Sequence, residues 1–128
     1  MNIALWIVQV VLFFAFMAAG VMKTFSPISE LAAGMAWVKD VNPIFMVRLP
    51  GIAEIVGAIG LILPALTRIK PRLTPLAAAA LAFVMVMAAI LHVSRGEFDM
   101  IVPNLVLVLL SAFVAVGRWK WKPIEAKK

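Results

Sequence analysis

The sequence predicts an all-α membrane protein: a four-transmembrane-helix bundle with a short amphipathic helix in its first outer loop. Two observations predict this fold. Hydrophobic residues make up 65% of the chain and charged residues only 14%, whereas soluble domains are about half apolar and about a quarter charged. Four apolar runs also reach the length that a helix needs to cross the hydrocarbon core. The runs cover residues 2–22, 49–66, 73–91 and 101–117, and together they make one transmembrane domain over residues 1–128.

Each run favours a helix over a barrel strand. Only helices and closed barrels satisfy their backbone hydrogen bonds within lipid, and these runs lack the alternating pattern of barrel strands. Prolines lie where helices tolerate them, with Pro75 near the start of the third run and Pro103 in the first turn of the fourth. The first run is expected to be a mature helix and not a signal peptide, because no positive charge precedes its long apolar core.

The first loop, residues 24–47, predicts a short helix of its own. Ser26 is a good N-cap, and Pro27 suits the first helical turn. Apolar residues then recur at helical spacing, at Leu31, Met35 and Val38. The pair Asn42-Pro43 is expected to end the helix. We therefore expect an amphipathic helix that lies on the outer surface or dips back into the bundle.

The charges outside the runs predict the orientation of the bundle. The loop between the second and third runs and the C-terminal tail are strongly basic. Their basic residues are Arg68, Lys70, Arg72, Arg118, Lys120, Lys122, Lys127 and Lys128, against a single acid, Glu125. The other two loops have nearly balanced charges. The positive-inside rule then predicts a multi-pass protein of the inner (plasma) membrane with both termini in the cytoplasm.

The composition argues against several classes of function. The chain has no cysteine, which excludes disulfides, thiol chemistry and iron–sulfur clusters. Its single histidine makes no convincing zinc or copper site, so no metal is expected. No nucleotide-binding loop or nucleophile elbow is present, and the chain carries no complete catalytic motif. The net charge of +6 comes from residues at the ends of apolar runs, so no nucleic-acid partner is expected.

Glu54 is the polar residue that most needs an explanation. It lies about two turns inside the second run, roughly 9 Å below Arg48 at the helical rise of about 1.5 Å per residue. On insertion scales a charge at the centre of a membrane helix costs about 2.5–3.5 kcal/mol. The carboxyl group of Glu54 must therefore have a partner or be protonated, and an intramembrane acid is a candidate functional site.

Other polar residues are expected to gather near Glu54. Each of the four helices brings a hydrogen-bonding group to the outer half of the bundle, whereas the inner half has few besides Gln9 and Ser111. The candidate ligand-binding residues are Lys23, Arg48, Glu54, His92 and Asn104. A few convergent polar groups among apolar walls are typical of a ligand pocket. The alternative is that Lys23 and Arg48 extend to lipid headgroups and that Glu54 forms a structural ion pair.

The second run also resembles a known family. The segment from Arg48 to Pro64, RLPGIAEIVGAIGLILP, is similar to the second-helix motif of the DoxX-like family. Gly20 followed by Lys23, the third run up to His92, and Asn104 in the fourth run resemble that family in order and spacing. The resemblance covers nearly the whole chain. It implies a small four-helix membrane protein. Some members are associated with a thiosulfate:quinone oxidoreductase, others with membrane oxidoreductase complexes, and a distant animal branch with receptor assembly.

Three hypotheses of function follow. The first is a redox-linked subunit that binds a quinone or another lipophilic molecule in the outer-leaflet pocket. His92 or Lys23 would donate to a quinone carbonyl, Glu54 would be the buried proton group, and Arg48 would hold its charge. Electrons would come from a membrane or peripheral oxidoreductase partner, because the chain has no cofactor of its own. The second is a non-enzymatic assembly or accessory protein in which the polar cluster is structural. The third is a small transporter in a homo-oligomer.

Overall fold

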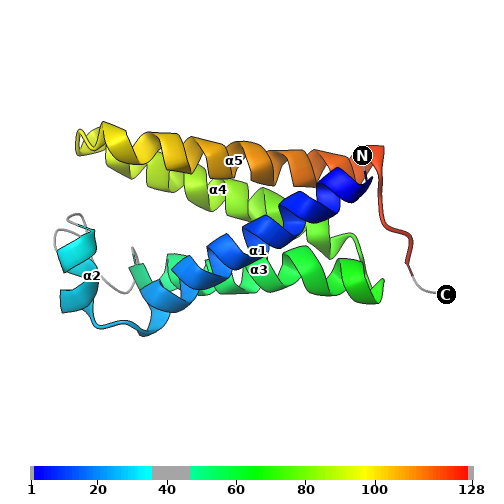
Figure 1. Ribbon diagram of the computed structural model, residues 1–128, viewed down its shortest axis with the longest axis horizontal. Coiled ribbons are helices and arrows are strands. Elements are labelled where there is room, and N and C mark those ends of the chain that lie inside the picture. The colour runs from blue at the N-terminus through cyan, green and yellow to red at the C-terminus, as the bar shows by residue number, and fades with distance from the viewer. Residues whose placement is uncertain (1, 36–46, 127–128) are drawn as a thin grey trace.

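The computed structural model describes residues 2–35 and 47–126, and within them it is helical throughout its regular structure (Figure 1). The four long helices are α1 (Asn2–Phe25), α3 (Leu49–Thr67), α4 (Leu73–Ser94) and α5 (Ile101–Val116). The fourth continues into a π-helical turn, η4 (Gly117–Trp121). All four are long and apolar enough to cross a membrane. The predicted fold class is therefore confirmed.

The helices begin where the apolar runs predict, at residues 2, 49, 73 and 101, but two of them end three residues later than predicted. The runs predicted ends at residues 22 and 91, whereas α1 continues to Phe25 and α4 to Ser94. The reason is that Lys23 and His92, which interrupt the apolar pattern, both find partners: Glu54 in α3 for Lys23, and Glu97 in the loop after α4 for His92. A polar residue with such a partner does not end a helix, so composition alone placed these two ends too early.

The short helix of the first loop, α2 (Ile28–Gly34), forms, but its predicted cap is wrong. Pro27 is itself the N-cap, with φ −59° and ψ 143°, and no side chain caps the helix. Ser26 lies one residue before this cap, and its backbone N–H closes the last turn of α1 on the carbonyl of Met22, at 3.0 Å. Met35 follows α2 with extended backbone and is a C-cap, not an interior position. Val38 and Asn42-Pro43 lie outside the described residues.

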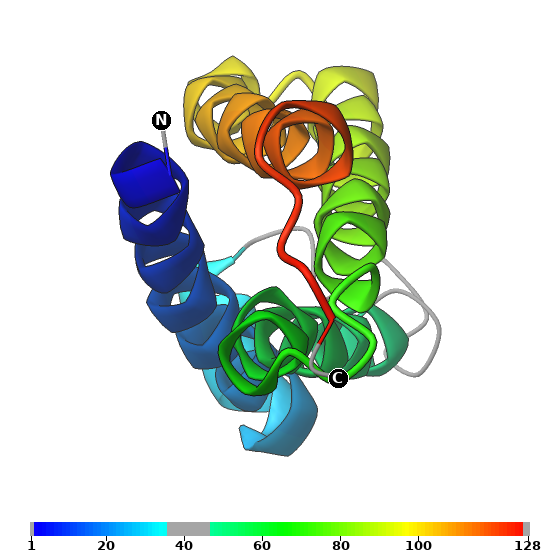
Figure 2. The same ribbon diagram turned by 90° about the vertical axis from the view of Figure 1, so that its right-hand side faces the viewer.

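The long helices pack as two pairs, α1 along α3 and α4 along α5, and the pairs meet chiefly through α3 and α4 (Figures 1 and 2). The α3–α4 turn and the chain termini lie at one end, called here the terminal end, and α2 lies at the other, called the α2 end. Glycines allow the close approach of α1 to α3. A Cβ atom on Gly20 would lie 2.7 Å from the carbonyl oxygen of Gly51, so only glycine fits there.

An apolar core fills the middle of the bundle between its two ends. Its buried residues are Leu12, Phe16, Ala58, Leu61, Ala78, Leu81, Met85 and Val114. The outer surface is apolar as well, with Ile3, Phe14 and Leu109 each more than 60% exposed. Soluble proteins rarely expose apolar patches of such extent, so this surface fits a lipid environment.

Candidate functional site

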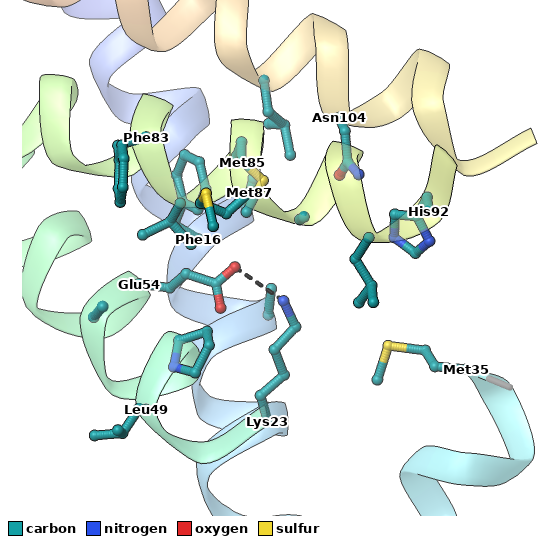
Figure 3. Close-up of a pocket in the computed structure, with 18 residues that line it drawn as sticks. Phe16, Lys23, Met35, Leu49, Glu54, Phe83, Met85, Met87, His92 and Asn104 are labelled. Carbon is teal, nitrogen blue, oxygen red and sulfur yellow. Dashed lines mark hydrogen bonds and ion pairs between the residues drawn. The ribbon is translucent and has the colours of Figure 1, made fainter. Parts of the chain in front are cut away.

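A cavity of about 550 Å³ opens at the α2 end of the bundle (Figure 3). Side chains from all four long helices and Met35 line it, and most of them are apolar. Its polar lining consists of Lys23, Glu54, His92 and Asn104. The structure thus places four of the five sequence-predicted residues around one cavity, and it places the fifth, Arg48, outside the lining.

Lys23 and Glu54 form an ion pair beside this cavity, with 3.0 Å between Nζ and Oε1. Glu54 lies on the buried face of α3 with Gly51 and Ala58, and its side chain is 1% exposed. Lys23 comes from the last turn of α1, which the Gly20–Gly51 contact holds close to α3. The ammonium group therefore turns into the bundle and does not extend to the lipid headgroups.

Arg48 has a different role from the one that the sequence predicted. Its Nη1 donates a hydrogen bond of 2.8 Å to the backbone carbonyl of Lys23. The residue lies directly before α3, and its guanidinium reaches back to the end of α1, where a carbonyl has no partner within the helix. Lys23, and not Arg48, therefore holds the charge of Glu54, while Arg48 fastens the backbone that carries Lys23.

His92 lies at the α2 end of α4 and is held from outside the cavity. Its Nδ1 lies 3.1 Å from Oε1 of Glu97, in the loop that follows α4, and Arg95 Nε donates to the same oxygen at 3.2 Å. An ionised carboxylate only accepts hydrogen bonds, so Nδ1 carries the hydrogen. This hydrogen bond from His92, with help from Arg95, lowers the pKa of Glu97. His92 thus lines the cavity with its ring held in place by Glu97.

Two buried polar atoms of the cavity residues have no hydrogen-bond partner, Oε2 of Glu54 and Nδ2 of Asn104. Asn104 lies in the first part of α5, across the cavity from Glu54 and Lys23 (Figure 3). A buried polar atom without a partner costs about 1–3 kcal/mol, and native proteins hold few of them. The arrangement therefore offers one acceptor and one donor to a molecule that enters the cavity.

Sequence reasoning missed a second buried polar group, which lies at the terminal end. Arg118 is 3% exposed, and its Nε and Nη1 donate to the side-chain oxygens of Gln9 and Asn2, both at 2.7 Å. The sequence interpretation counted Arg118 as a surface charge and found few polar groups in this half, and the structure corrects both points. A signal existed, because Asn2 and Gln9 are two helical turns apart and lie on one face of α1.

Within residues 2–35 and 47–126, no cluster of three or more acidic, histidine or cysteine side chains could hold a metal ion. The fold and the cavity define the class of the protein: a small multi-pass helical membrane protein whose four spans enclose a mainly apolar cavity with a few polar residues. The chain belongs to the DoxX-like family, whose model matches residues 7–114, from α1 into α5. No curated protein and no solved structure gave a significant match.

Proposed function

We propose that the cavity at the α2 end binds a neutral, lipid-soluble molecule of the quinone class, and that the chain is a redox-linked subunit of a membrane system. The observation that carries this proposal is the pair of unpartnered buried atoms, Glu54 Oε2 and Asn104 Nδ2, on residues that line one cavity. A hydroxyl group on a ring would donate to Glu54 Oε2, and a carbonyl or hydroxyl oxygen would accept from Asn104 Nδ2.

The size and charge of the cavity support this ligand class. A volume of about 550 Å³ falls within the range of about 300–1,000 Å³ that is typical of small-molecule sites. The charges of Lys23 and Glu54 neutralise each other, so a neutral ligand leaves no charge unpaired. The walls carry aromatic and thioether side chains, those of Phe16, Phe83, Met85 and Met87, which suit a ring and an apolar tail.

Each polar residue has a distinct part in this proposal. Asn104 Nδ2 would donate to a carbonyl oxygen of the ligand, and the Lys23 ammonium is a second donor. Glu54 Oε2 would accept from a hydroxyl group and exchange the proton that accompanies reduction. His92 helps to shape the cavity, because its Nδ1 is engaged by Glu97. Electrons would come from an oxidoreductase partner, since the chain itself supplies binding and proton exchange.

The test uses the purified full chain in lipid nanodiscs and equilibrium binding of radiolabelled decylubiquinone. Asn104→Leu removes the donor while keeping the volume similar, and we expect about tenfold weaker binding, as for one lost hydrogen bond. Ser111→Ala is the matched control, because Ser111 lies two turns further along α5, is also buried and unpartnered, and does not line the cavity. Equal binding by wild type and Asn104→Leu would contradict the proposal.

A non-enzymatic accessory role is the second candidate, favoured by the bonds that tie α1 to α3 through Lys23. In that case the polar residues are purely structural. Asn104→Leu separates the two candidates, because Asn104 Nδ2 bonds to no group in the described fold. The accessory role predicts that this variant keeps its stability and its protein partners, and that no quinone binds to either form.

A further inference from the structure

Arg118 carries a buried positive charge whose partners are all neutral. Its hydrogen-bond acceptors are the side-chain oxygens of Gln9 and Asn2 and the backbone carbonyl of Lys122. The ring of Trp6 lies 5.5 Å from the guanidinium carbon. Buried charges are normally paired with an opposite charge, because the loss of hydration is costly. In the described part of the chain, no carboxylate compensates Arg118.

A second cavity, of about 550 Å³, lies against this group at the terminal end. Arg118 lines it together with two other cations, Arg68 and Lys122, and no carboxylate is among the lining residues that the structure describes. The Nη2 atom of Arg118 is buried and has no hydrogen-bond partner. This cavity shares no lining residue with the one at the α2 end.

The fold holds these cations in place. The π turn after α5 directs Arg118 inward, and Gly117 allows it because a Cβ atom there would clash with Leu5 of α1. The chain after this turn crosses the terminal end toward α3 (Figure 2). Arg68, directly after α3, holds this C-terminal segment in place, because its Nε donates a hydrogen bond of 2.9 Å to the carbonyl of Glu125. The cavity thus has walls from α1, α3 and the C-terminal segment.

We propose that this cavity binds a phosphate group, either on the headgroup of an anionic lipid or as free phosphate. Guanidinium groups match phosphate oxygens in charge and in hydrogen-bond geometry, which gives the unpartnered Nη2 an acceptor. Basic pockets beside membrane helices commonly hold anionic headgroups. A phosphate also supplies the negative charge that the Arg118 environment lacks. The site is independent of the quinone proposal.

The test compares the full chain in phosphatidylcholine nanodiscs with and without phosphatidylglycerol, and counts the retained lipids by native mass spectrometry. Arg68→Gln and Lys122→Gln each remove an exposed cation of the cavity, so folding should persist. We expect each variant to bind phosphatidylglycerol about fivefold more weakly, as for the loss of one basic residue at an anionic surface. Lys120→Gln is the matched control, since Lys120 is exposed on the same turn but outside this cavity.

A second arm distinguishes the two sources of phosphate. The same four proteins in dodecylmaltoside are titrated with inorganic phosphate while thermal unfolding is followed. Free phosphate is a ligand if it stabilises the wild type and Lys120→Gln equally, and stabilises Arg68→Gln and Lys122→Gln less. A lipid headgroup is the ligand if the two variants weaken phosphatidylglycerol binding in nanodiscs while inorganic phosphate stabilises none of the four proteins. An equal loss in Lys120→Gln, or no anion binding in either arm, overturns the proposal.

Discussion

The Lys23–Glu54 ion pair joins the last turn of α1 to α3, and the carboxylate is almost fully withdrawn from the surface. Such a pair stabilises the fold only while both partners are present. Removing one partner leaves the other charge buried and uncompensated, whereas replacing both by apolar side chains is often neutral. Arg48 adds to this junction by bonding to the Lys23 carbonyl.

We therefore expect Glu54→Gln to destabilise the fold by about 3–5 kcal/mol, because the Lys23 ammonium loses its only charged partner in the described fold. The double variant Lys23→Met with Glu54→Leu should recover most of this loss. Unfolding in mixed micelles of dodecylmaltoside and sodium dodecyl sulfate measures the free energy of unfolding of the single and the double variant. A double variant as unstable as the single one would show that the charge pair does not govern stability here.

The residues of the cavity show what the sequence can and cannot predict at this scale. Lys23, Glu54, His92 and Asn104 were placed together because each lies near the same end of a membrane-spanning run, and helix length then fixes their depth. The choice of partner for Glu54 was wrong. Lys23 lies in another helix, and the close packing of α1 on α3 at Gly20 and Gly51, which the sequence pattern does not show, brings it within 3.0 Å of Glu54.

The elements were predicted well at their starts and less well at their ends. Prolines and charged residues mark the starts of α3, α4 and α5, and these signals are local. The ends depend on whether a polar residue finds a partner in the folded chain, as Lys23 does in α3 and His92 in the loop after α4. The inward turn of Arg118 was missed for the same reason, since its partners Asn2 and Gln9 are more than 100 residues away in sequence.

The contact between α1 and α3 should be the least tolerant of added volume. A Cβ atom on Gly20 would meet the backbone oxygen of Gly51, whereas one on Gly57 would meet the end of the Leu81 side chain. We expect Gly20→Ala to cost about 1–3 kcal/mol, as overpacking commonly does, and to cost more than Gly57→Ala, because a side chain can rotate away and a backbone cannot. Thermal unfolding in detergent compares the two variants, and equal losses would contradict this account.

At the scale of the whole molecule, charge differs between the two ends of the bundle. The loop between α3 and α4 and the segment after α5 lie at the terminal end, and their described residues hold six cations against one acid. These cations are Arg68, Lys70, Arg72, Arg118, Lys120 and Lys122. By the positive-inside rule we propose that this end faces the cytoplasm of a plasma-membrane protein, so that the cavity at the α2 end lies in the outer leaflet.

The absence of cysteine gives a direct measurement of this orientation. Ser94→Cys introduces a thiol at the α2 end and Ala126→Cys one at the terminal end, both at exposed positions. In intact cells a membrane-impermeant maleimide should label the first and not the second, and both should react after lysis. Labelling of the Ala126→Cys protein alone in intact cells would reverse the proposed orientation.

The apolar middle of the bundle also decides how charge can move through a single chain. Along α5 the inward polar residues Asn104, Ser111 and Arg118 follow one another at intervals of two turns, roughly 10 Å at the helical rise of about 1.5 Å per residue. Proton transfer needs groups within about 3 Å of each other or a bridging water, and Ser111 lies among the packed apolar side chains of the core. The described residues of a single chain therefore provide no continuous path for protons between the two ends of the bundle. A proton taken up or released at Glu54 would therefore exchange with the α2 end of the bundle alone.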